Sequence, residues 1–475
     1  MDLREFLKRN ESVDILRFIT CGSVDDGKST LIGRLLYDAK GIFEDQLNGA
    51  RNERGEIDFA NLVDGLASER EQGITIDVAY RFFSTDKKKY IIADTPGHEQ
   101  YTRNMATAAS TADVAVILID ARKGVLTQSK RHSFIASLLG IRHVIVAINK
   151  MDLMDFRQDV FEDIKSDYLK MSRNLPHSER IKFDFIPISA LNGDNILKNS
   201  ENTPWYKGLA LLPTLDALDV SPDRPSEFRF AVQYVNRPHL NFRGYCGTIT
   251  GGEIRENDEV VVLPSNKKAR VKSIVTTDDN LDLGVKGKDD AFKTAPQAFA
   301  PQAITLCLDR EVDVSRGDMI AKPANLPQVT RKFNANIVWM NEAPLTPGEQ
   351  YLIKINSNLI NAQFDEILYK RDVNNFEKLK ASRLELNDIA KCAVSLDKSV
   401  CADLYEQNRQ SGSFIVIDRY TNATLGAGMI TEFLGDGHDG EFDAKNASNR
   451  EYSDAERELN AYVRKFYPEW GCKQI

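Results

Sequence analysis

The sequence is poor in cysteine. Only 6 cysteines occur among 475 residues, and no two of them form a Cys-x-x-Cys pair. That pair is typical of zinc sites, and small disulfide-linked proteins carry a far higher share of cysteine. We therefore expect neither a zinc site nor a disulfide framework, but reduced and mostly buried thiols.

Long hydrophobic runs are missing as well. No stretch offers the roughly 18 uninterrupted apolar residues that a membrane helix requires. Residues 1–14 mix acidic and basic side chains and lack the apolar core of a signal peptide. These absences predict a cytoplasmic protein that is not attached to a membrane.

Positive charge is not in excess. The chain has 62 Lys and Arg residues against 70 Asp and Glu residues, and its formal net charge is -8. Proteins that bind duplex or transfer RNA usually gather an excess of basic residues on one face. The charge balance therefore argues against a nucleic-acid partner.

The N-terminal part of the chain reads as alternating strands and helices. Apolar runs at 90–93, 114–119, 144–148 and 185–188 are typical of buried strands. Runs of this kind suit a mostly parallel sheet that is covered on both faces. Because a Ser- and Pro-containing linker follows, we predict an α/β domain over residues 1–221.

The pattern then changes to period two. Apolar residues alternate with polar ones from Phe228 onward, and a second block of the same kind starts at Phe333. Short alternating runs separated by turn residues indicate antiparallel barrels. We predict one all-β barrel over residues 222–326 and a second over residues 327–434.

The C-terminal tail, residues 435–475, differs from both. It begins with a polar stretch that is rich in Gly and Asp, and residues 453–456 then form a capping box. Apolar residues follow at helical spacing. We expect a C-terminal helix, docked on its own barrel or used to bind a partner.

A phosphate-binding motif follows the first predicted strand. It fits the pattern G-x-x-x-x-G-K-[ST] and reads Gly22-Ser23-Val24-Asp25-Asp26-Gly27-Lys28-Ser29. Its glycines let successive backbone N–H groups point into one concavity at the start of a helix, where phosphate oxygens bind. Lys28 would reach the β and γ phosphates, and Ser29 would be a ligand of Mg²⁺.

Three further motifs occur in an order that fits one site. Asp94-Thr95-Pro96-Gly97 follows a strand, which places a carboxylate near Mg²⁺ and a glycine N–H near the γ phosphate. Thr75, in Gly73-Ile74-Thr75, would be another Mg²⁺ ligand. Asn149-Lys150-Met151-Asp152 and Ser189-Ala190-Leu191 each follow a later strand.

The last two motifs indicate which base is bound. The Asp152 carboxylate would accept hydrogen bonds from N1–H and N2–H₂ of guanine, and a backbone N–H of residues 189–191 would reach the guanine carbonyl. Adenine has no such donor pair and would leave the carboxylate unpaired, which disfavours it strongly. The sequence therefore predicts a GTP-binding protein that uses Mg²⁺.

The predicted nucleotide-binding residues are Gly22, Ser23, Val24, Asp25, Asp26, Gly27, Lys28, Ser29, Thr30, Asp94, Thr95, Pro96, Gly97, His98, Asn149, Lys150, Met151, Asp152, Ser189, Ala190 and Leu191. His98 is the predicted catalytic residue, because it follows Gly97 where a GTPase places its water-orienting group. Val24 and Ile74 would flank it as an apolar gate. The other histidines show no ligand spacing, and we assign no role to His132, His143, His177, His239 or His438.

With two barrels behind them, these motifs resemble the translation-factor GTPases of the elongation factor Tu and 1-alpha type. Two positions depart from the true elongation factors, which usually have His at the Asp26 position and Ala or Cys at the Thr95 position. These departures, together with residues 102–106, 122–125 and 421–428, resemble the family of large, GTPase subunits of bacterial sulfate adenylyltransferase.

The resemblance implies a heteromer. A smaller catalytic adenylyltransferase subunit would make adenosine 5'-phosphosulfate and pyrophosphate from ATP and sulfate, for sulfate assimilation and the biosynthesis of hydrogen sulfide and cysteine. GTP hydrolysis by this chain would drive that step. Two alternatives remain open at this point: an elongation-factor-like GTPase that delivers an RNA, against which the acidic charge and the motif departures argue, and a free-standing regulatory GTPase.

Overall fold

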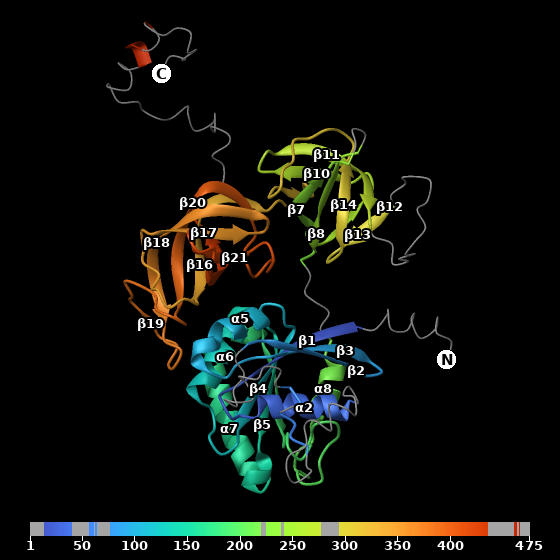
Figure 1. Cartoon of the computed structure of the whole chain (residues 1–475), viewed down its shortest axis with the longest axis vertical. Coiled ribbons are helices and arrows are strands. Elements are labelled where there is room, and N and C mark those ends of the chain that lie inside the picture. Colours follow the sequence, from blue (N-terminus) through green and yellow to red (C-terminus); the bar gives the residue numbers. More distant parts are fainter. Residues whose placement is uncertain are drawn as a thin grey trace.

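An α/β domain lies below two β-barrels in the computed structural model (Figure 1). The structure describes residues 14–39, 57–60, 62–63, 77–219, 225–238, 242–276, 294–435, 460–462 and 465. The predicted order of an α/β domain followed by two all-β barrels is confirmed. The capping box at 453–456 lies outside the described residues, whereas residues 460–462 and 465 are helical.

The α/β domain is built on a six-stranded sheet with strand order β2-β3-β1-β4-β5-β6. Its strands are β1 (Asp14–Cys21), β2 (Ala79–Ser84), β3 (Lys88–Asp94), β4 (Val114–Asp120), β5 (His143–Asn149) and β6 (Lys182–Pro187). Only the edge strand β2 is antiparallel to its neighbour. Because the other five strands run in parallel, the loops that follow their carboxyl ends meet at one edge of the sheet.

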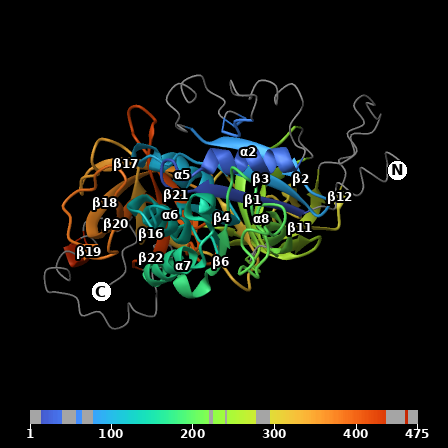
Figure 2. The same cartoon turned by 90° about the horizontal axis from the view of Figure 1, so that it is seen from below.

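Helices cover both faces of this sheet (Figure 2). They are α2 (Lys28–Asp38), α5 (Thr102–Ala109), α6 (Thr127–Leu138), α7 (Gln158–Ser172) and α8 (Leu211–Ala217), with short 3-10 turns η1 (Glu99–Tyr101), η2 (Met151–Met154) and η3 (Ser178–Arg180). Apolar residues of α2 and α8 pack on one face, and those of α5, α6 and α7 on the other. Every residue of β4 is buried, as its continuous apolar run predicts.

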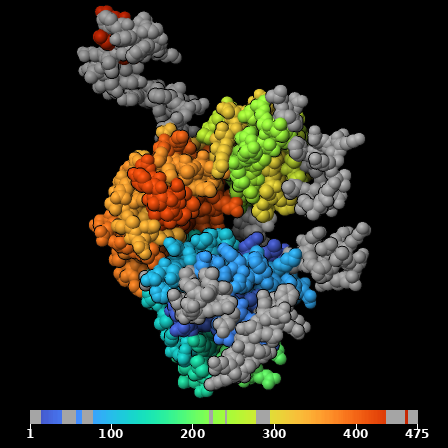
Figure 3. All heavy atoms as spheres, viewed as in Figure 1, coloured from blue at the N-terminus to red at the C-terminus, as the bar shows by residue number. Residues whose placement is uncertain are grey.

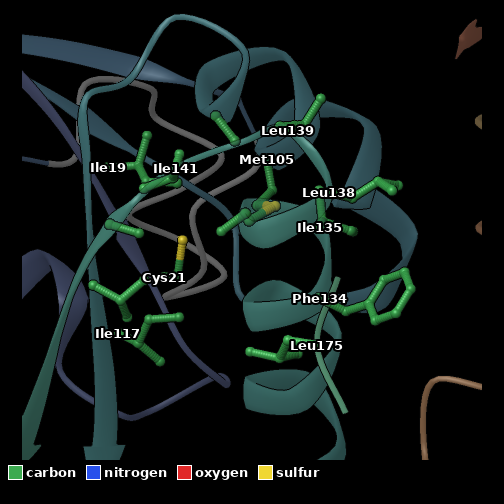
Figure 4. Close-up of a cluster of buried hydrophobic side chains, with 14 of the residues drawn as sticks. Ile19, Cys21, Met105, Ile117, Phe134, Ile135, Leu138, Leu139, Ile141 and Leu175 are labelled. Atoms are coloured by element: carbon green, nitrogen blue, oxygen red, sulfur yellow. The ribbon is translucent and has the colours of Figure 1, made fainter. Parts of the chain in front are cut away.

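The core under α5 and α6 reaches the end of β1. Figure 4 shows Ile19, Cys21 and Ile117 from the sheet facing side chains of these helices, among them Met105 and Ile135. All five of these residues are fully buried. The strand that leads into the phosphate-binding motif is therefore anchored by close packing at its carboxyl end.

Each β-barrel closes through a pairing of its outer strands. In the first barrel β10 pairs with β11, and in the second β17 pairs with β18. The sheet of the first contains β7 (Arg229–Asn236), β8 (Gly244–Gly251), β10 (Glu259–Leu263), β11 (Lys267–Val275), β12 (Thr294–Ala295), β14 (Ala303–Leu308) and β15 (Met319–Ala321), and β9 (Glu253–Arg255) pairs with β13 (Gln297–Phe299) in a separate two-stranded sheet. The second contains β16 (Gln328–Trp339), β17 (Gln350–Ile355), β18 (Asn358–Arg371), β19 (Lys378–Leu379), β20 (Ile389–Ala402), β21 (Ser413–Ile417) and β22 (Thr424–Phe433).

The second barrel lies against the α/β domain (Figure 3). The Tyr405 hydroxyl donates to the carbonyl of Leu139 at 3.1 Å, and the Arg409 guanidinium donates to the carbonyl of Gly140. The rings of Phe134, on α6, and Phe376 stack with their centroids 5.6 Å apart. The α6 helix and the residues just after it therefore provide much of this contact.

A buried ion pair joins the two barrels. Arg229, on β7, lies 3.0 Å from the Asp403 carboxylate, and their side chains are only 4% and 7% exposed. Ser411 Oγ also donates to Asp403 at 2.6 Å, and Arg229 donates to the carbonyl of Asn325 at 2.8 Å. Each charge is therefore satisfied only while the two barrels stay together.

Five of the six cysteines lie in the described part of the chain. Cys21, Cys246, Cys307, Cys392 and Cys401 are free thiols, and all but Cys246 are buried. Cys472 lies outside the described residues. No helix within the described ranges has both the length and the apolar character needed to cross a membrane.

We predict that Asp403→Ala destabilises the pair of barrels by about 3–5 kcal/mol, because it leaves the Arg229 guanidinium buried without its counter-charge. The measurement is the urea midpoint of barrel unfolding. Glu311→Ala is the matched control, because Glu311 is 76% exposed and pairs with Arg237 at 3.5 Å. Equal midpoints for the two variants would contradict this account of the joint.

Candidate nucleotide-binding site

The phosphate-binding motif forms a tight loop between β1 and α2. Gly27 caps α2 in the left-handed conformation at φ 91°, and Gly22 has φ 146°. A Cβ atom added to Gly27 would lie 2.5 Å from Asn149 Nδ2. One added to Gly22 would lie 2.7 Å from the carbonyl oxygen of Leu118. Both glycines of the motif are therefore required by the close approach of the neighbouring strands β4 and β5.

Lys28 lies within this loop. Its side-chain Nζ donates to the carbonyls of Ser23 at 2.7 Å and Gly22 at 3.3 Å, and the residue is only 7% exposed. Burial lowers the pKa of Lys28, while the negative charges of Asp94 and Asp26 act in the opposite direction. The lysine is thus a buried cation at the centre of the loop.

Asp94 stands at the end of β3, opposite Thr20 on β1. Its carboxylate accepts hydrogen bonds from Thr20 Oγ1 at 3.2 Å and from Ser29 Oγ at 3.4 Å. Thr95 Oγ1 in turn donates to the carbonyl of Thr20 at 2.5 Å. Ser29 and Asp94, two of the predicted Mg²⁺ ligands, therefore lie side by side in the folded chain.

The oxygen chemistry of Ser29 and Asp94 suits Mg²⁺. Mg²⁺ prefers hard oxygen ligands and keeps several waters, so that a hydroxyl and a carboxylate are enough protein ligands for it. No larger group of His, Cys, Asp and Glu suited to a metal occurs among the described residues. The third predicted ligand, Thr75, and the gate residue Ile74 lie outside the described residues.

Gly97 and His98 lie next to the phosphate loop. A Cβ atom on Gly97 would be 2.5 Å from Lys28 Nζ and 2.9 Å from the backbone nitrogen of Val24. His98 is exposed, and its Nδ1 accepts a long hydrogen bond of 3.5 Å from the backbone N–H of Gln100. The predicted catalytic histidine is therefore adjacent to the loop but held by little of the surrounding protein.

The two base-recognition motifs are tied together by Asn149. Its Nδ2 donates to the Asp26 carbonyl at 2.8 Å, and its Oδ1 accepts from the backbone N–H of Ala190 at 3.0 Å. Asp152 lies in η2, three positions after Asn149, and is partly exposed. The structure thus brings the three loops together at one edge of the sheet.

Lys150 adds a second link from the same loop. It adopts the left-handed conformation at φ 63°, and its Nζ donates to the carbonyl of Asp25 and lies 3.2 Å from Asp120 Oδ2. The remaining predicted residues, Thr30, Pro96, Met151, Ser189 and Leu191, occupy the same loops and their flanks.

Sequence reasoning missed Asp120, which ends β4 and is fully buried. Burial would raise the pKa of Asp120, but hydrogen bonds from Arg122 and Lys150 outweigh it and hold that pKa well below its usual range. The Arg122 guanidinium donates to both carboxylate oxygens, at 3.0 and 2.6 Å. Its position at the end of a buried strand, like that of Asp94, was the available signal.

His132 was also missed, since the sequence analysis assigned it no role. It lies on α6, is fully buried, and its Nδ1 accepts a hydrogen bond of 3.1 Å from the backbone N–H of Gly22. The contact spans 110 positions of the sequence. No local pattern could have revealed it.

Comparisons with known proteins agree with this geometry. Residues 13–222 match the family model of the elongation factor Tu GTP binding domain, and residues 332–431 match that of the GTP-eEF1A C-terminal domain-like family. A solved structure of Sup35 complexed with GDP overlaps this chain with a TM-score of 0.40 and 21% identity, covering 89% of this chain and 95% of that one. So loose an overlap says nothing about the site.

Curated relatives match along the whole chain. Proteins named sulfate adenylyltransferase subunit 1 are 54% identical in Sulfurovum sp. (strain NBC37-1) and 53% identical in Aliarcobacter butzleri (strain RM4018), and each alignment covers 100% of this chain and 98% of the relative. The protein of that name in Cellvibrio japonicus (strain Ueda107) is 52% identical over 100% of this chain and 97% of its own length. The chain therefore belongs to the family of sulfate adenylyltransferase subunit 1, and its N-terminal part is a GTP-binding domain of the elongation factor Tu type.

Proposed function

We propose that this chain is the GTPase subunit of a sulfate adenylyltransferase. Its hydrolysis of GTP would drive the synthesis of adenosine 5'-phosphosulfate and pyrophosphate from ATP and sulfate on a smaller catalytic subunit. The observation that carries the proposal is the joining of the phosphate loop, Asp94 and the two base-recognition loops in a chain whose relatives, matched over 98% of their length, are named sulfate adenylyltransferase subunit 1. The same relatives favour this function over RNA delivery.

The phosphate loop would bind the triphosphate through its backbone N–H groups, the start of α2 and the Lys28 ammonium. Lys28 now donates to two loop carbonyls, so a phosphate would replace neutral acceptors by charged ones. Burial of the lysine strengthens that attraction, because water screens a buried charge less.

Guanine would be read by Asp152, with a backbone N–H of residues 189–191 donating to the base carbonyl. Asn149 supports this reading indirectly, since its amide already bonds Asp26 and Ala190 and so holds both loops in register. Lys150 and Asp120 strengthen the same loop from the side of β4.

Ser29 and Asp94 would hold Mg²⁺, with Thr75 as a further ligand. The ion would neutralise charge on the phosphates during hydrolysis. His98 would orient the attacking water, whose oxygen bonds to the γ phosphorus as the bond to the β–γ bridging oxygen breaks, releasing GDP and inorganic phosphate. Gly97, which lies against Lys28 and Val24, keeps His98 beside the γ-phosphate position.

We also propose the boundaries of the domains. The GTPase domain would span residues 1–221, the barrels 222–326 and 327–434, and the tail 435–475. The positions of the last strand of the first barrel, β15 (Met319–Ala321), and the first strand of the second, β16 (Gln328–Trp339), support the middle boundary.

The coupling of the two reactions tests the proposal directly. GTP turnover by this chain alone should be slow, and the purified catalytic subunit with ATP and sulfate should accelerate it, because His98 is exposed and needs a partner to order it. Adenosine 5'-phosphosulfate yield should be higher with GTP than with a non-hydrolysable analogue. Equal GTPase rates in every mixture, together with equal yields, would leave the chain as a nucleotide-binding scaffold only.

We predict that Asp152→Asn shifts nucleotide preference from GTP towards xanthosine triphosphate. The Asn amide can donate to the 2-oxo group of xanthine, where the carboxylate could only accept from the guanine amino group. Competition titrations measure the preference, with Asp155→Asn, a nearby exposed carboxylate, as the control. Unchanged selectivity for GTP in Asp152→Asn would show that the base is read elsewhere.

We predict that His98→Ala leaves GTP affinity within a few-fold but slows hydrolysis by at least about a hundred-fold, the scale expected for a lost water-orienting group. Lys28→Ala should instead abolish binding. Single-turnover phosphate release in the presence of the catalytic subunit measures the rate. Gln100→Ala is the matched control, because it keeps the backbone N–H that His98 accepts; a parent-like rate in His98→Ala would make the histidine structural.

A further inference from the structure

We infer that His132 is a positioning residue of the nucleotide site: it holds the first glycine of the phosphate loop through a hydrogen bond that its ring accepts. His132 Nδ1 lies 3.1 Å from the backbone nitrogen of Gly22, and the ring is fully buried under the loop. The inference rests on the proposed function, because it concerns the same site. The middle of α6, where His132 lies, would thus contribute to nucleotide binding.

Gly22 needs such an anchor. Its φ of 146° belongs to the region that side chains rarely adopt, and the carbonyl of Leu118 approaches within 2.7 Å of where a Cβ would stand. The Gly22 N–H points into the protein, and would be a buried donor without an acceptor if His132 did not take it. The hydrogen bond therefore fixes the direction in which the loop leaves β1.

The hydrogen bond requires a neutral ring. An acceptor Nδ1 carries no proton, so the ring proton is on Nε2. Burial lowers the pKa of His132 to about 3, and the positive charges of Lys28 and Arg131 act in the same direction. The ring is therefore neutral throughout the physiological range, and its acceptor is always available to Gly22.

Packing alone does not explain a histidine here. Its Nε2 is buried and has no hydrogen-bond partner within the part of the chain that the structure describes. An apolar side chain of similar size would fill the same space without that unpaired donor. The polar ring is favourable at this place only because its other nitrogen serves the phosphate loop.

The same helix also contacts the segment on the other side of the γ-phosphate position. Gln128 Nε2, one turn before His132 on α6, donates to the Gly97 carbonyl at 3.4 Å. Arg131 Nη1 donates to Gln128 Oε1 at 2.9 Å and so orients that amide. The first half of α6 thus supports Gly22 through His132 and Gly97 through Gln128. Of these two hydrogen bonds, the one made by His132 is buried.

Two substitutions separate positioning from packing. In His132→Asn the side-chain oxygen can stand near the former Nδ1 and accept from Gly22, whereas His132→Leu fills the space and offers no acceptor. We expect GDP and GTP dissociation constants of the full-length chain to rise roughly tenfold or more in His132→Leu and to stay within about threefold of the parent in His132→Asn. If His132→Leu does not fold, His132→Gln replaces it, because its amide reaches the Nε2 position instead.

The matched control is His143, another histidine of the same domain, whose Nδ1 is buried and has no hydrogen-bond partner among the described residues. It begins β5, at the end of the sheet opposite the nucleotide site, so its Leu and Asn variants should bind both nucleotides like the parent. If the Leu variant of His132 binds as well as the parent, or the Asn variant binds no better than the Leu variant, the positioning role is overturned. If the parent itself binds no guanine nucleotide, the proposed function fails instead.

Discussion

The nucleotide site depends on the two hydrogen bonds of the Asn149 side chain. One joins it to the phosphate loop at Asp26 and the other to the residue 189–191 loop at Ala190. Asn149 is nearly fully buried, so both bonds form away from water, where an unpaired amide would be costly. There is no room for a side chain at position 27 beside this amide. The phosphate and base loops can therefore keep their spacing only with glycine at position 27 and asparagine at position 149.

Helix α6 connects this site to the second barrel. Its first turn reaches the Gly97 carbonyl through Gln128, and its middle reaches Gly22 through His132. The carbonyl of Leu139, just after its last residue, accepts from Tyr405 of the barrel. A helix of 12 residues is about 18 Å long, so this one element spans the distance between the two contacts. The nucleotide loops and the second barrel therefore share one supporting helix.

Most of the fold was predictable because its signals are local. The phosphate loop, the buried strand β4 and the period-two barrel strands each follow from residues within one short window. Asp94 and Asn149 were predicted to follow strands, and in the structure they are the last residues of β3 and β5, where parallel strands bring such residues to one edge.

His132 was not predictable, because its meaning depends on a contact between distant segments. His132 stands between Arg131 and Ser133 and shows no ligand spacing, so only the approach of Gly22 distinguishes it. The Asp403 carboxylate is a similar case, since nothing around it in the sequence indicates that Arg229 of another barrel will pair with it. Residues whose role comes from tertiary contact have no sequence period, and so they leave no pattern to detect.

Several of the residues that we propose for nucleotide binding are buried, whereas the residue that we propose for hydrolysis is exposed. Lys28, Asp26 and Asn149 are nearly inaccessible and are held by short hydrogen bonds, so the loops that grip the nucleotide have few alternative arrangements. His98 is exposed, and its ring accepts a long hydrogen bond of 3.5 Å from the Gln100 N–H. A surface that orders the segment around His98 would change the rate of hydrolysis without changing the contacts that hold the phosphates and the base. Under the proposed roles, separate residues with different burial would determine binding and hydrolysis, so the rate of hydrolysis could be regulated without loosening the nucleotide.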